Sequence, residues 1–152
     1  MKKIVLFDMD GTLTPPRKPL DPLLLPILKA VAAYAEIGIV TGSDIDYMKE
    51  QIGFLIDNSY IRYQLHLLPC NGTKHYAPPS YTHESHRLNS KAAFKQHIGK
   101  KNFNRIMKIL IDYQNYICGH FELPLTGHFI SYRGSMINWC PIGRSAVKEE
   151  RD

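Results

Sequence analysis

Cysteine is scarce in this sequence, with three residues in a chain of 152. Cys70, Cys118 and Cys140 lie far apart, and no two of them form a CxxC pair. Their number is odd, and this spacing gives little support to a disulfide framework or a zinc cluster, both of which need paired or clustered thiols. We therefore expect reduced thiols and a cytoplasmic location.

Long apolar runs are absent as well. A membrane-spanning helix requires about 20 apolar residues, and no stretch approaches that length. Lys2 and Lys3 precede only a short apolar run, which ends at Asp8. The pattern predicts neither a signal peptide nor a membrane anchor.

Acidic residues are missing from one long segment. Between Ser85 and Ile111 every charged residue is basic, in a chain whose formal net charge is +5. Such a segment attracts anions, which leaves open nucleic acid, phosphorylated metabolites or only a solvated helix face. Between Tyr81 and Tyr116, tyrosines and phenylalanines are interleaved with basic residues. Their helical spacing favours packing over base stacking, so we do not expect a nucleic-acid partner.

The first half alternates between short apolar runs and helical patterns. With 44% hydrophobic and 22% charged residues, the chain has the composition of a globular protein. Strands are predicted at Ile4–Phe7, within Glu36–Val40 and in part of Ile61–Leu68; helices are predicted after Asp21-Pro22 and from Asp44 to about Gln51. This order predicts an α/β fold with a parallel sheet, whose active residues lie at the carboxyl ends of the strands.

The second half differs in its pattern, beginning near the loop Ala77–Ser80. One long helix is predicted from an apolar stripe at Ile106, Ile109, Leu110, Tyr113 and Ile117. Two antiparallel strands are predicted after it, at Phe129–Tyr132 and Met136–Cys140. We expect a separate α+β unit, with residues 1–80 in the first unit and residues 81–152 in the second.

The candidate catalytic residues come directly after the first strand, where Asp8 and Asp10 flank Met9. An aspartate at this place can present one oxygen to phosphorus and the other to Mg²⁺. The residue two positions on points to the same side and can exchange a proton with the leaving oxygen. The pattern predicts Asp8 as nucleophile and Asp10 as general acid/base. Both are predicted Mg²⁺ ligands, Asp10 through its backbone carbonyl. A simple bend at Asp10-Gly11 is the alternative interpretation.

A second candidate segment, Thr41-Gly42-Ser43, lies between the second strand and the helix that follows. The hydroxyls of Thr41 and Ser43 and the free N–H groups of the helix terminus can bind phosphoryl oxygens. The alternative is that Ser43 or Asp44 only caps the helix.

The segment that begins at Asp8 resembles the DxDGTL signature of the haloacid dehalogenase superfamily. Further segments resemble the eukaryotic-type phosphomannomutase family in order and spacing, at Leu13–Arg17, Phe129–Arg133, Met136–Arg144 and Glu149–Arg151. The resemblance covers essentially the whole chain. It implies a haloacid dehalogenase-like (Rossmann-like) core with an α+β cap, Mg²⁺ dependence and a cytoplasmic homodimer formed through the cap. It also implies interconversion of mannose 6-phosphate and mannose 1-phosphate on the route to GDP-mannose.

The resemblance also implies roles for single residues. Asp8 and Asp10 match the catalytic pair, and Arg17 matches a contact to the substrate phosphate. Arg133, Arg144 and Arg151 match cap residues that hold the distal phosphate of a hexose bisphosphate. Planar guanidinium groups suit this task because they bind phosphate through two parallel hydrogen bonds.

The sequence departs from the family pattern at several positions. Thr41 stands where the family usually has glycine, and Cys70 and Ser131 stand where it usually has glutamate. The lysine and the further acidic residues that complete the family's phosphoryl and Mg²⁺ sites have no counterpart before Asp152. We therefore expect an amino-terminal portion with an incomplete core and cap, and the activity of the chain alone stays open. The alternatives are a haloacid dehalogenase-type sugar phosphatase and a non-catalytic remnant that binds phosphate-bearing ligands.

Overall fold

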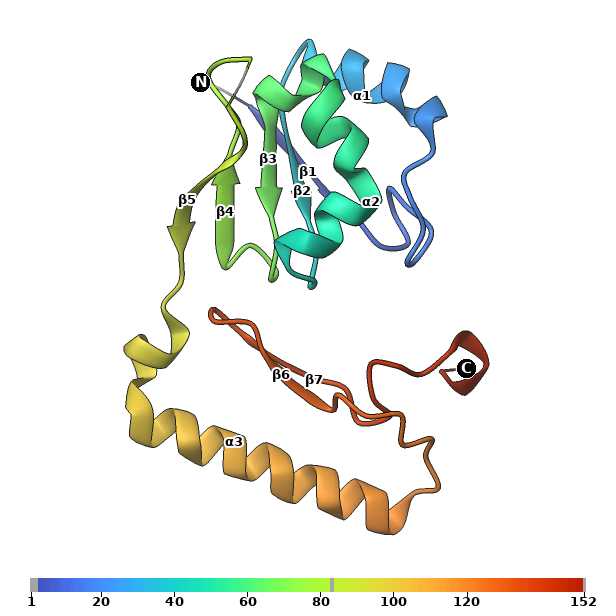
Figure 1. Ribbon diagram of the computed structural model, residues 1–152, viewed down its shortest axis with the longest axis vertical. Helices are drawn as coiled ribbons and strands as arrows, with labels where there is room; N and C mark the ends of the chain where they lie inside the picture. Colours follow the sequence, from blue (N-terminus) through green and yellow to red (C-terminus); the bar gives the residue numbers. More distant parts are fainter. Residues whose placement is uncertain (1–2, 83, 152) are drawn as a thin grey trace. The chain divides into compact units, whose positions relative to one another are not determined.

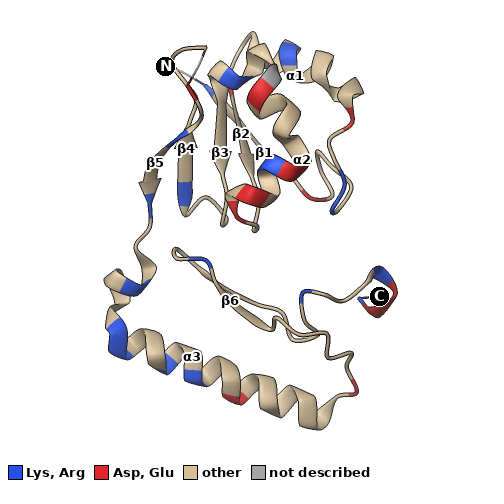
Figure 2. Cartoon of the chain, viewed as in Figure 1, with Lys and Arg blue, Asp and Glu red and all other residues tan. Residues whose placement is uncertain are grey.

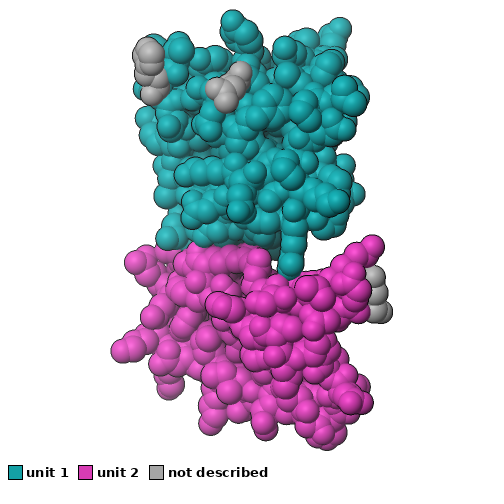
Figure 3. Space-filling model, turned by 45° about the vertical axis from the view of Figure 1, so that its right-hand side comes forward, with its two compact units in different colours: residues 1–92 teal, residues 93–152 magenta. Residues whose placement is uncertain are grey.

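The computed structural model describes residues 3–82 and 84–151. The chain forms two compact units, residues 1–92 and residues 93–152, drawn in teal and magenta in Figure 3. The composition placed the division at residue 80, whereas the units divide after Ala92. The reason is that the segment Arg87–Lys91 pairs as a strand with the sheet of the first unit.

The first unit contains a five-stranded sheet in the order β1-β2-β3-β4-β5 (Figure 1). The strands are β1 (Ile4–Asp8), β2 (Glu36–Val40), β3 (Leu65–Leu68), β4 (Lys74–Ala77) and β5 (Arg87–Lys91). Strands β1, β2 and β3 are parallel, and β4 and β5 add to them antiparallel. The predicted α/β fold with a parallel sheet is confirmed, and the antiparallel extension is a feature that the sequence pattern did not indicate.

Two helical segments connect the parallel strands. Asp21 caps the short helix η1 (Pro22–Leu24) by accepting a hydrogen bond from the Leu23 N–H at 2.9 Å, and α1 (Leu25–Ala32) follows. After β2, α2 (Ile45–Asn58) runs beyond the predicted end at Gln51. The backbone angles of Ile52 are not helical, with φ −123° and ψ 18°. The helix nevertheless continues, because Leu55 and Ile56 are buried in the core.

The apolar stretch that predicted the third strand divides into two elements. Its first part forms the short helix η2 (Tyr60–Gln64), and only the second part forms β3. The same stretch buries Ile61, Leu65 and Leu67. The apolar pattern therefore identified the buried residues correctly but not the type of secondary structure at Tyr60–Gln64.

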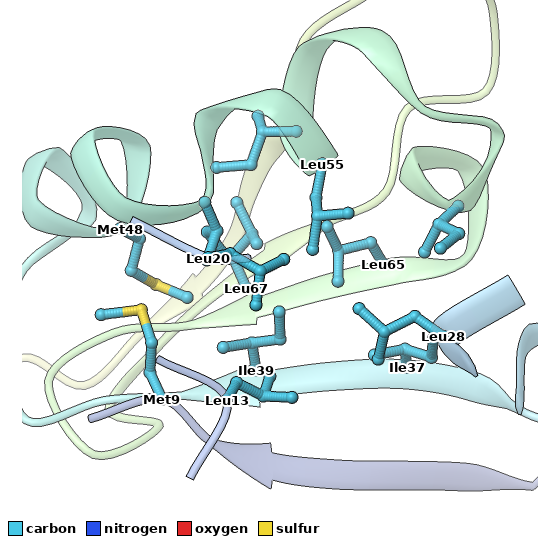
Figure 4. Close-up of a cluster of buried hydrophobic side chains, with 13 residues drawn as sticks. Met9, Leu13, Leu20, Leu28, Ile37, Ile39, Met48, Leu55, Leu65 and Leu67 are labelled. Carbon is cyan, nitrogen blue, oxygen red and sulfur yellow. The ribbon is translucent and has the colours of Figure 1, made fainter. Parts of the chain in front are cut away.

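The core of the first unit lies between the sheet and the helices (Figure 4). Alternate residues of β2 and β3 face it, including Ile37, Ile39 and Leu65, all fully buried. Burying one such side chain contributes about 1.5–3 kcal/mol. Met9 and Met48 point toward one another at one end of this cluster, so the loop after β1 is anchored to α2 through the core.

The opposite face of the sheet carries a row of polar side chains. His66 Nδ1 lies 2.8 Å from His75 Nε2, and His66 Nε2 lies 3.1 Å from Glu36 Oε2. Asn89 Nδ2 lies 3.3 Å from His75 Nδ1. One proton arrangement satisfies all three contacts, in which each neutral imidazole carries its proton on Nε2, because a carboxylate can only accept. In this arrangement the row links β2, β3, β4 and β5 through their side chains.

We predict that acid weakens the first unit through His75. Burial, and then the nearby His66, lower the pKa of His75 below its ordinary value of 6.5. The unfolded chain then binds a proton more readily than the folded chain, so stability is complete above about pH 6.5 and falls as the pH drops toward the folded-state pKa. Urea unfolding between pH 7.5 and pH 5 is expected to show this loss.

The variant His75→Gln keeps a side-chain donor for His66 and removes the titrating ring, so its unfolding free energy should depend less on pH. The exposed His97 supplies the control variant His97→Gln, which should behave as the wild type. The unfolding free energy of both variants should still depend on pH to some extent, because burial also lowers the pKa of His86. Equal slopes in His75→Gln and the wild type would contradict the assignment.

The second unit contains a long helix and a β-hairpin (Figure 1). Its elements are α3 (Phe94–His120), β6 (Ile130–Tyr132), β7 (Ile137–Trp139) and the short helix η3 (Lys148–Glu150). The hairpin packs on α3, since the Tyr132 ring lies 4.9 Å from that of Phe103. Trp139 Nε1 also donates to Gln114 Oε1 at 2.8 Å. The predicted helix and antiparallel strand pair are both present, each strand being shorter than predicted.

The acid-free segment lies on β5 and the first half of α3, where Figure 2 shows the Lys and Arg residues. A glycine interrupts this half of the helix, because Gly99 adopts φ +79°, ψ 154°. Among the described residues, no helix is both long and apolar enough to span a membrane.

Candidate active site

The loop after β1 is built around a buried residue. Met9 is fully buried, and its N–H donates to the Val40 carbonyl at 3.0 Å. Its own carbonyl accepts hydrogen bonds from the N–H groups of Leu13 and Thr14 at 3.1 and 2.9 Å. Because successive side chains alternate in direction, Asp8 and Asp10 both lie on the side away from the core. The loop places the two carboxylates together at the carboxyl end of β1.

The two carboxylates have different surroundings. Asp8 is exposed, and its Oδ2 accepts one long hydrogen bond, 3.4 Å from Thr12 Oγ1. Asp10 is partly buried and is held through both oxygens. Tyr47 Oη donates to its Oδ1 at 2.6 Å, and Thr41 Oγ1 donates to its Oδ2 at 3.3 Å. Asp8 is therefore the more accessible carboxylate and Asp10 the more firmly oriented one.

Tyr47 was not identified from the sequence. It lies in the first turn of α2, and burial, followed by the hydrogen bond and charge of Asp10, raises its pKa to about 12. Its hydroxyl also accepts a hydrogen bond from the Arg17 N–H at 3.1 Å. No sequence signal marks this residue, because Tyr47 and Asp10 meet only through the packing of α2 beside the loop.

Thr41-Gly42-Ser43 lies where β2 leads into α2, as predicted. Thr41 is buried, and its Oγ1 accepts a hydrogen bond from the Ser43 N–H at 3.1 Å. The turn after β3 holds this segment, since the Cys70 N–H donates to the Ser43 carbonyl and the Asn71 N–H to the Thr41 carbonyl, each at 2.8 Å. The structure thus brings Asp10 and Thr41 into direct contact and sets Ser43 in the same loop.

The turn that holds this loop has an unusual backbone. Cys70, Asn71 and Gly72 all have positive φ, at 54°, 55° and 76°. Cysteine rarely adopts this conformation, and such conformations occur at functional sites where the surrounding structure imposes them. The Cys70 side chain is fully buried.

The N-terminus of α2 is capped by Asp44 rather than by Ser43. The Asp44 Oδ1 accepts from the Ile45 N–H at 2.7 Å. Lys74, at the start of β4, places its Nζ 2.7 and 2.6 Å from the two oxygens of the same carboxylate. Burial alone would lower the pKa of Lys74, but the hydrogen bond and charge of Asp44 outweigh it, so the pKa is raised. No pattern in the sequence indicated a buried lysine at this position.

We predict that Lys74→Met destabilises the first unit by about 1–3 kcal/mol, because the variant removes the charged partner of a partly buried carboxylate. The contribution of the pair should be complete below the ordinary lysine pKa of 10.5. Above it, the contribution should decrease as the pH rises through the higher folded-state pKa.

Urea unfolding at pH 8 and at pH 11 checks this prediction. The control is Lys49→Met, which changes a mostly exposed lysine on α2. Equal unfolding free energies for Lys74→Met and the wild type at pH 8 would contradict it.

Arg17 lies on the exposed loop that follows Thr14. Its φ of 60° lies in the left-handed region, which is uncommon for a residue other than glycine. The hydrogen bond from its N–H to Tyr47 ties this backbone to the same hydroxyl that holds Asp10.

Asp8 and Asp10 fit Mg²⁺ in donor chemistry, because it prefers carboxylate and other hard oxygen ligands. The number of ligating side chains is small, since the described residues contain no group of three or more His, Cys, Asp or Glu side chains that could hold a metal ion. Both carboxylate oxygens of Asp10 already accept a hydrogen bond, and the predicted ligand from this residue is its backbone carbonyl. These two aspartates are the residues that would hold the ion.

In the second unit the predicted arginines lie on and after the hairpin. Arg133 begins the turn between β6 and β7, where its N–H donates to the Met136 carbonyl at 2.9 Å. Arg144 Nη1 donates to Asn138 Oδ1 at 3.0 Å. Arg151 donates from Nε to the Ala146 carbonyl and from Nη2 to the Arg144 carbonyl, both at 3.0 Å. The Arg151 guanidinium therefore holds the backbone beside Arg144.

Comparison with known proteins identifies first the class and then the family. The structure resembles an IMP-nucleotidase from Plasmodium falciparum with a TM-score of 0.63 at 14% identity, covering 90% of this chain and 39% of that one. It also resembles a haloalkanoate-superfamily phosphatase from Bacteroides thetaiotaomicron with a TM-score of 0.50 at 21% identity. This match covers 74% of this chain and 36% of that one. These likenesses show the haloacid dehalogenase fold.

The family follows from the sequence. The profile of the eukaryotic phosphomannomutase family matches residues 24–152. A phosphomannomutase from Solanum lycopersicum is 33% identical over 150 residues, which are 98% of this chain and 54% of the relative. Phosphomannomutase 1 from Mus musculus is 34% identical over 149 residues, which are 97% of this chain and 52% of the relative. The chain belongs to the eukaryotic phosphomannomutase family, and it spans about half the length of these curated relatives.

Proposed function

We propose that this chain carries the phosphoryl-transfer site of a phosphomannomutase, which interconverts mannose 6-phosphate and mannose 1-phosphate through an aspartyl-phosphate in GDP-mannose biosynthesis. The observation that carries the proposal is the pair of carboxylates at the end of β1, with Asp8 accessible and Asp10 held by two hydroxyls. Membership of the family supports the substrate class.

Asp8 acts as the nucleophile. One of its oxygens bonds to phosphorus, the bond from phosphorus to the sugar oxygen breaks, and Asp10 gives its proton to that oxygen. In the return step Asp10 takes the proton from the free hydroxyl of a hexose monophosphate. This oxygen attacks the aspartyl-phosphate, which forms a hexose bisphosphate and releases Asp8. After the bisphosphate has turned over, Asp8 takes the phosphoryl group from its other end and Asp10 returns the proton to the sugar oxygen. Mg²⁺ bound by Asp8 and Asp10 would offset the negative charge that builds up around phosphorus.

Substrate binding is assigned to the remaining candidates. Thr41 and Ser43 lie in the loop beside Asp10. Ser43 supplies a hydroxyl for the transferring phosphoryl group, and Thr41 does so only when its single proton turns away from Asp10. Arg17, Arg133, Arg144 and Arg151 supply guanidinium groups for phosphate. A hexose bisphosphate must turn over between the two transfers, so phosphate groups at either end of the sugar need such partners.

We further propose a cytoplasmic homodimer formed through the second unit. The three cysteines are free thiols, which is consistent with a reducing compartment. On α3, Ile109, Tyr113 and Tyr116 are 48%, 58% and 54% exposed. Large apolar and aromatic side chains exposed on one helix are typical of a protein interface.

We predict that Asp8→Asn lowers mutase turnover by about 10³-fold or more, because an amide cannot act as the phosphoryl acceptor. The full chain is incubated with mannose 1-phosphate, Mg²⁺ and a hexose bisphosphate primer, and mannose 6-phosphate is followed by ³¹P NMR. The matched control is Asp46→Asn, since the Asp46 side chain on α2 is 92% exposed.

Three outcomes separate the alternatives. Inorganic phosphate released without mannose 6-phosphate would indicate a sugar phosphatase. Binding of mannose 1-phosphate without any turnover would indicate a non-catalytic phosphate-binding protein. Undiminished mutase turnover in Asp8→Asn would contradict the assignment of the nucleophile.

A further inference from the structure

Tyr47 connects three parts of the first unit through one hydroxyl group. The Tyr47 Oη donates its only proton to Asp10 Oδ1 at 2.6 Å and accepts the Arg17 N–H at 3.1 Å. A phenol hydroxyl has one donor and can accept further bonds, so both contacts form at the same time. The hydroxyl therefore joins the carboxylate loop, the Arg17 loop and α2.

The Arg17 backbone needs such a partner. Its φ of 60° is disfavoured for arginine, and a conformation of this kind persists only when surrounding contacts impose it. The Arg17 N–H is directed to Tyr47, so the hydroxyl helps to keep this residue in the left-handed region. The direction in which the Arg17 side chain leaves the loop depends on this backbone conformation.

Asp10 is oriented from two sides. Tyr47 holds Oδ1, and Thr41 holds Oδ2 at 3.3 Å. The two hydroxyls come from different elements, so the carboxylate plane cannot rotate without breaking one of these bonds. A carboxylate that must give and take a proton at defined places benefits from this restriction.

The base of this arrangement is itself rigid. Tyr47 lies in the first turn of α2, and its ring packs against the hydrophobic core. Asp44 caps the same turn, and Lys74 binds both oxygens of Asp44. The Tyr47 hydroxyl is thus presented from a turn that is fixed by the core on one side and by an ion pair on the other.

We propose that Tyr47 is a positioning residue whose hydroxyl sets Asp10 and Arg17 in one fixed geometry, so that proton transfer and phosphate binding depend on the same side chain. The kinetic part of the proposal rests on the proposed function. The structural part, that the hydroxyl holds the Arg17 backbone, does not.

The test uses the full chain and the variant Tyr47→Phe, which keeps the ring in the core and removes only the hydroxyl. Backbone amide exchange measured by NMR should become about fivefold faster at Arg17, as expected for the loss of one hydrogen bond. In the mutase assay kcat should fall by about 10- to 100-fold and KM for mannose 1-phosphate should rise, since small misplacements of a catalytic group cost this much.

Two further variants serve as controls. Tyr34→Phe makes the same chemical change at a tyrosine that is 86% exposed, and it should alter neither amide exchange nor kinetics. Thr41→Val removes the other hydroxyl on Asp10 and should leave exchange at Arg17 unchanged, because the Arg17 N–H binds the Tyr47 hydroxyl, which this variant keeps. Circular dichroism confirms that each variant is folded.

The outcomes distinguish this proposal from the proposed function. If the wild-type chain shows no mutase turnover while Arg17 exchange accelerates in Tyr47→Phe, the hydroxyl holds the loop as proposed and the assigned reaction is wrong. If exchange at Arg17 is unchanged in Tyr47→Phe, the proposal is overturned. It is also overturned if an active Tyr47→Phe enzyme keeps the wild-type kcat and KM.

Discussion

The burial of Met9 is the constraint on which the candidate active site depends. Its side chain is fully buried, its N–H binds the end of β2, and its carbonyl closes the following loop through Leu13 and Thr14. Because the side chain of Met9 points into the core, the side chains of its two neighbours point away from it. The aspartates on either side must face outward together, so one apolar contact determines where two charges lie.

The sequence predicted the parts of this arrangement that local patterns determine. The apolar run before Asp8 identified β1, and a strand was predicted within Glu36–Val40, the whole of which forms β2. Thr41-Gly42-Ser43 was correctly placed between β2 and a helix. These predictions succeeded because a continuous apolar run and a polar turn at its end each leave a signal in the sequence, and β1 keeps this signal although Ile4, Val5 and Leu6 are exposed.

The features that the sequence did not predict depend on contacts between distant segments. Strand β4 contains Lys74, His75 and Tyr76, a polar composition that does not indicate a strand. It forms where His66 and Asp44 supply partners for His75 and Lys74. Tyr47 could not be identified for the same reason, since the residues that it joins are 30 and 37 positions away. In the second unit, Arg151 matched a phosphate contact, whereas its guanidinium binds two backbone carbonyls in the structure.

The different surroundings of the two aspartates agree with different chemical tasks. A nucleophile must approach phosphorus, and Asp8 is exposed with one long hydrogen bond that a ligand can replace at little cost. A general acid/base needs a constant orientation toward the oxygen that it serves, and Asp10 accepts hydrogen bonds on both oxygens from separate elements. Two carboxylates of one short motif are thus distinguished by their neighbours alone, and the neighbours of Asp10 come from the loop after β2 and from α2 rather than from the motif itself. The division of roles between Asp8 and Asp10 is therefore a property of the folded unit and not of the motif alone.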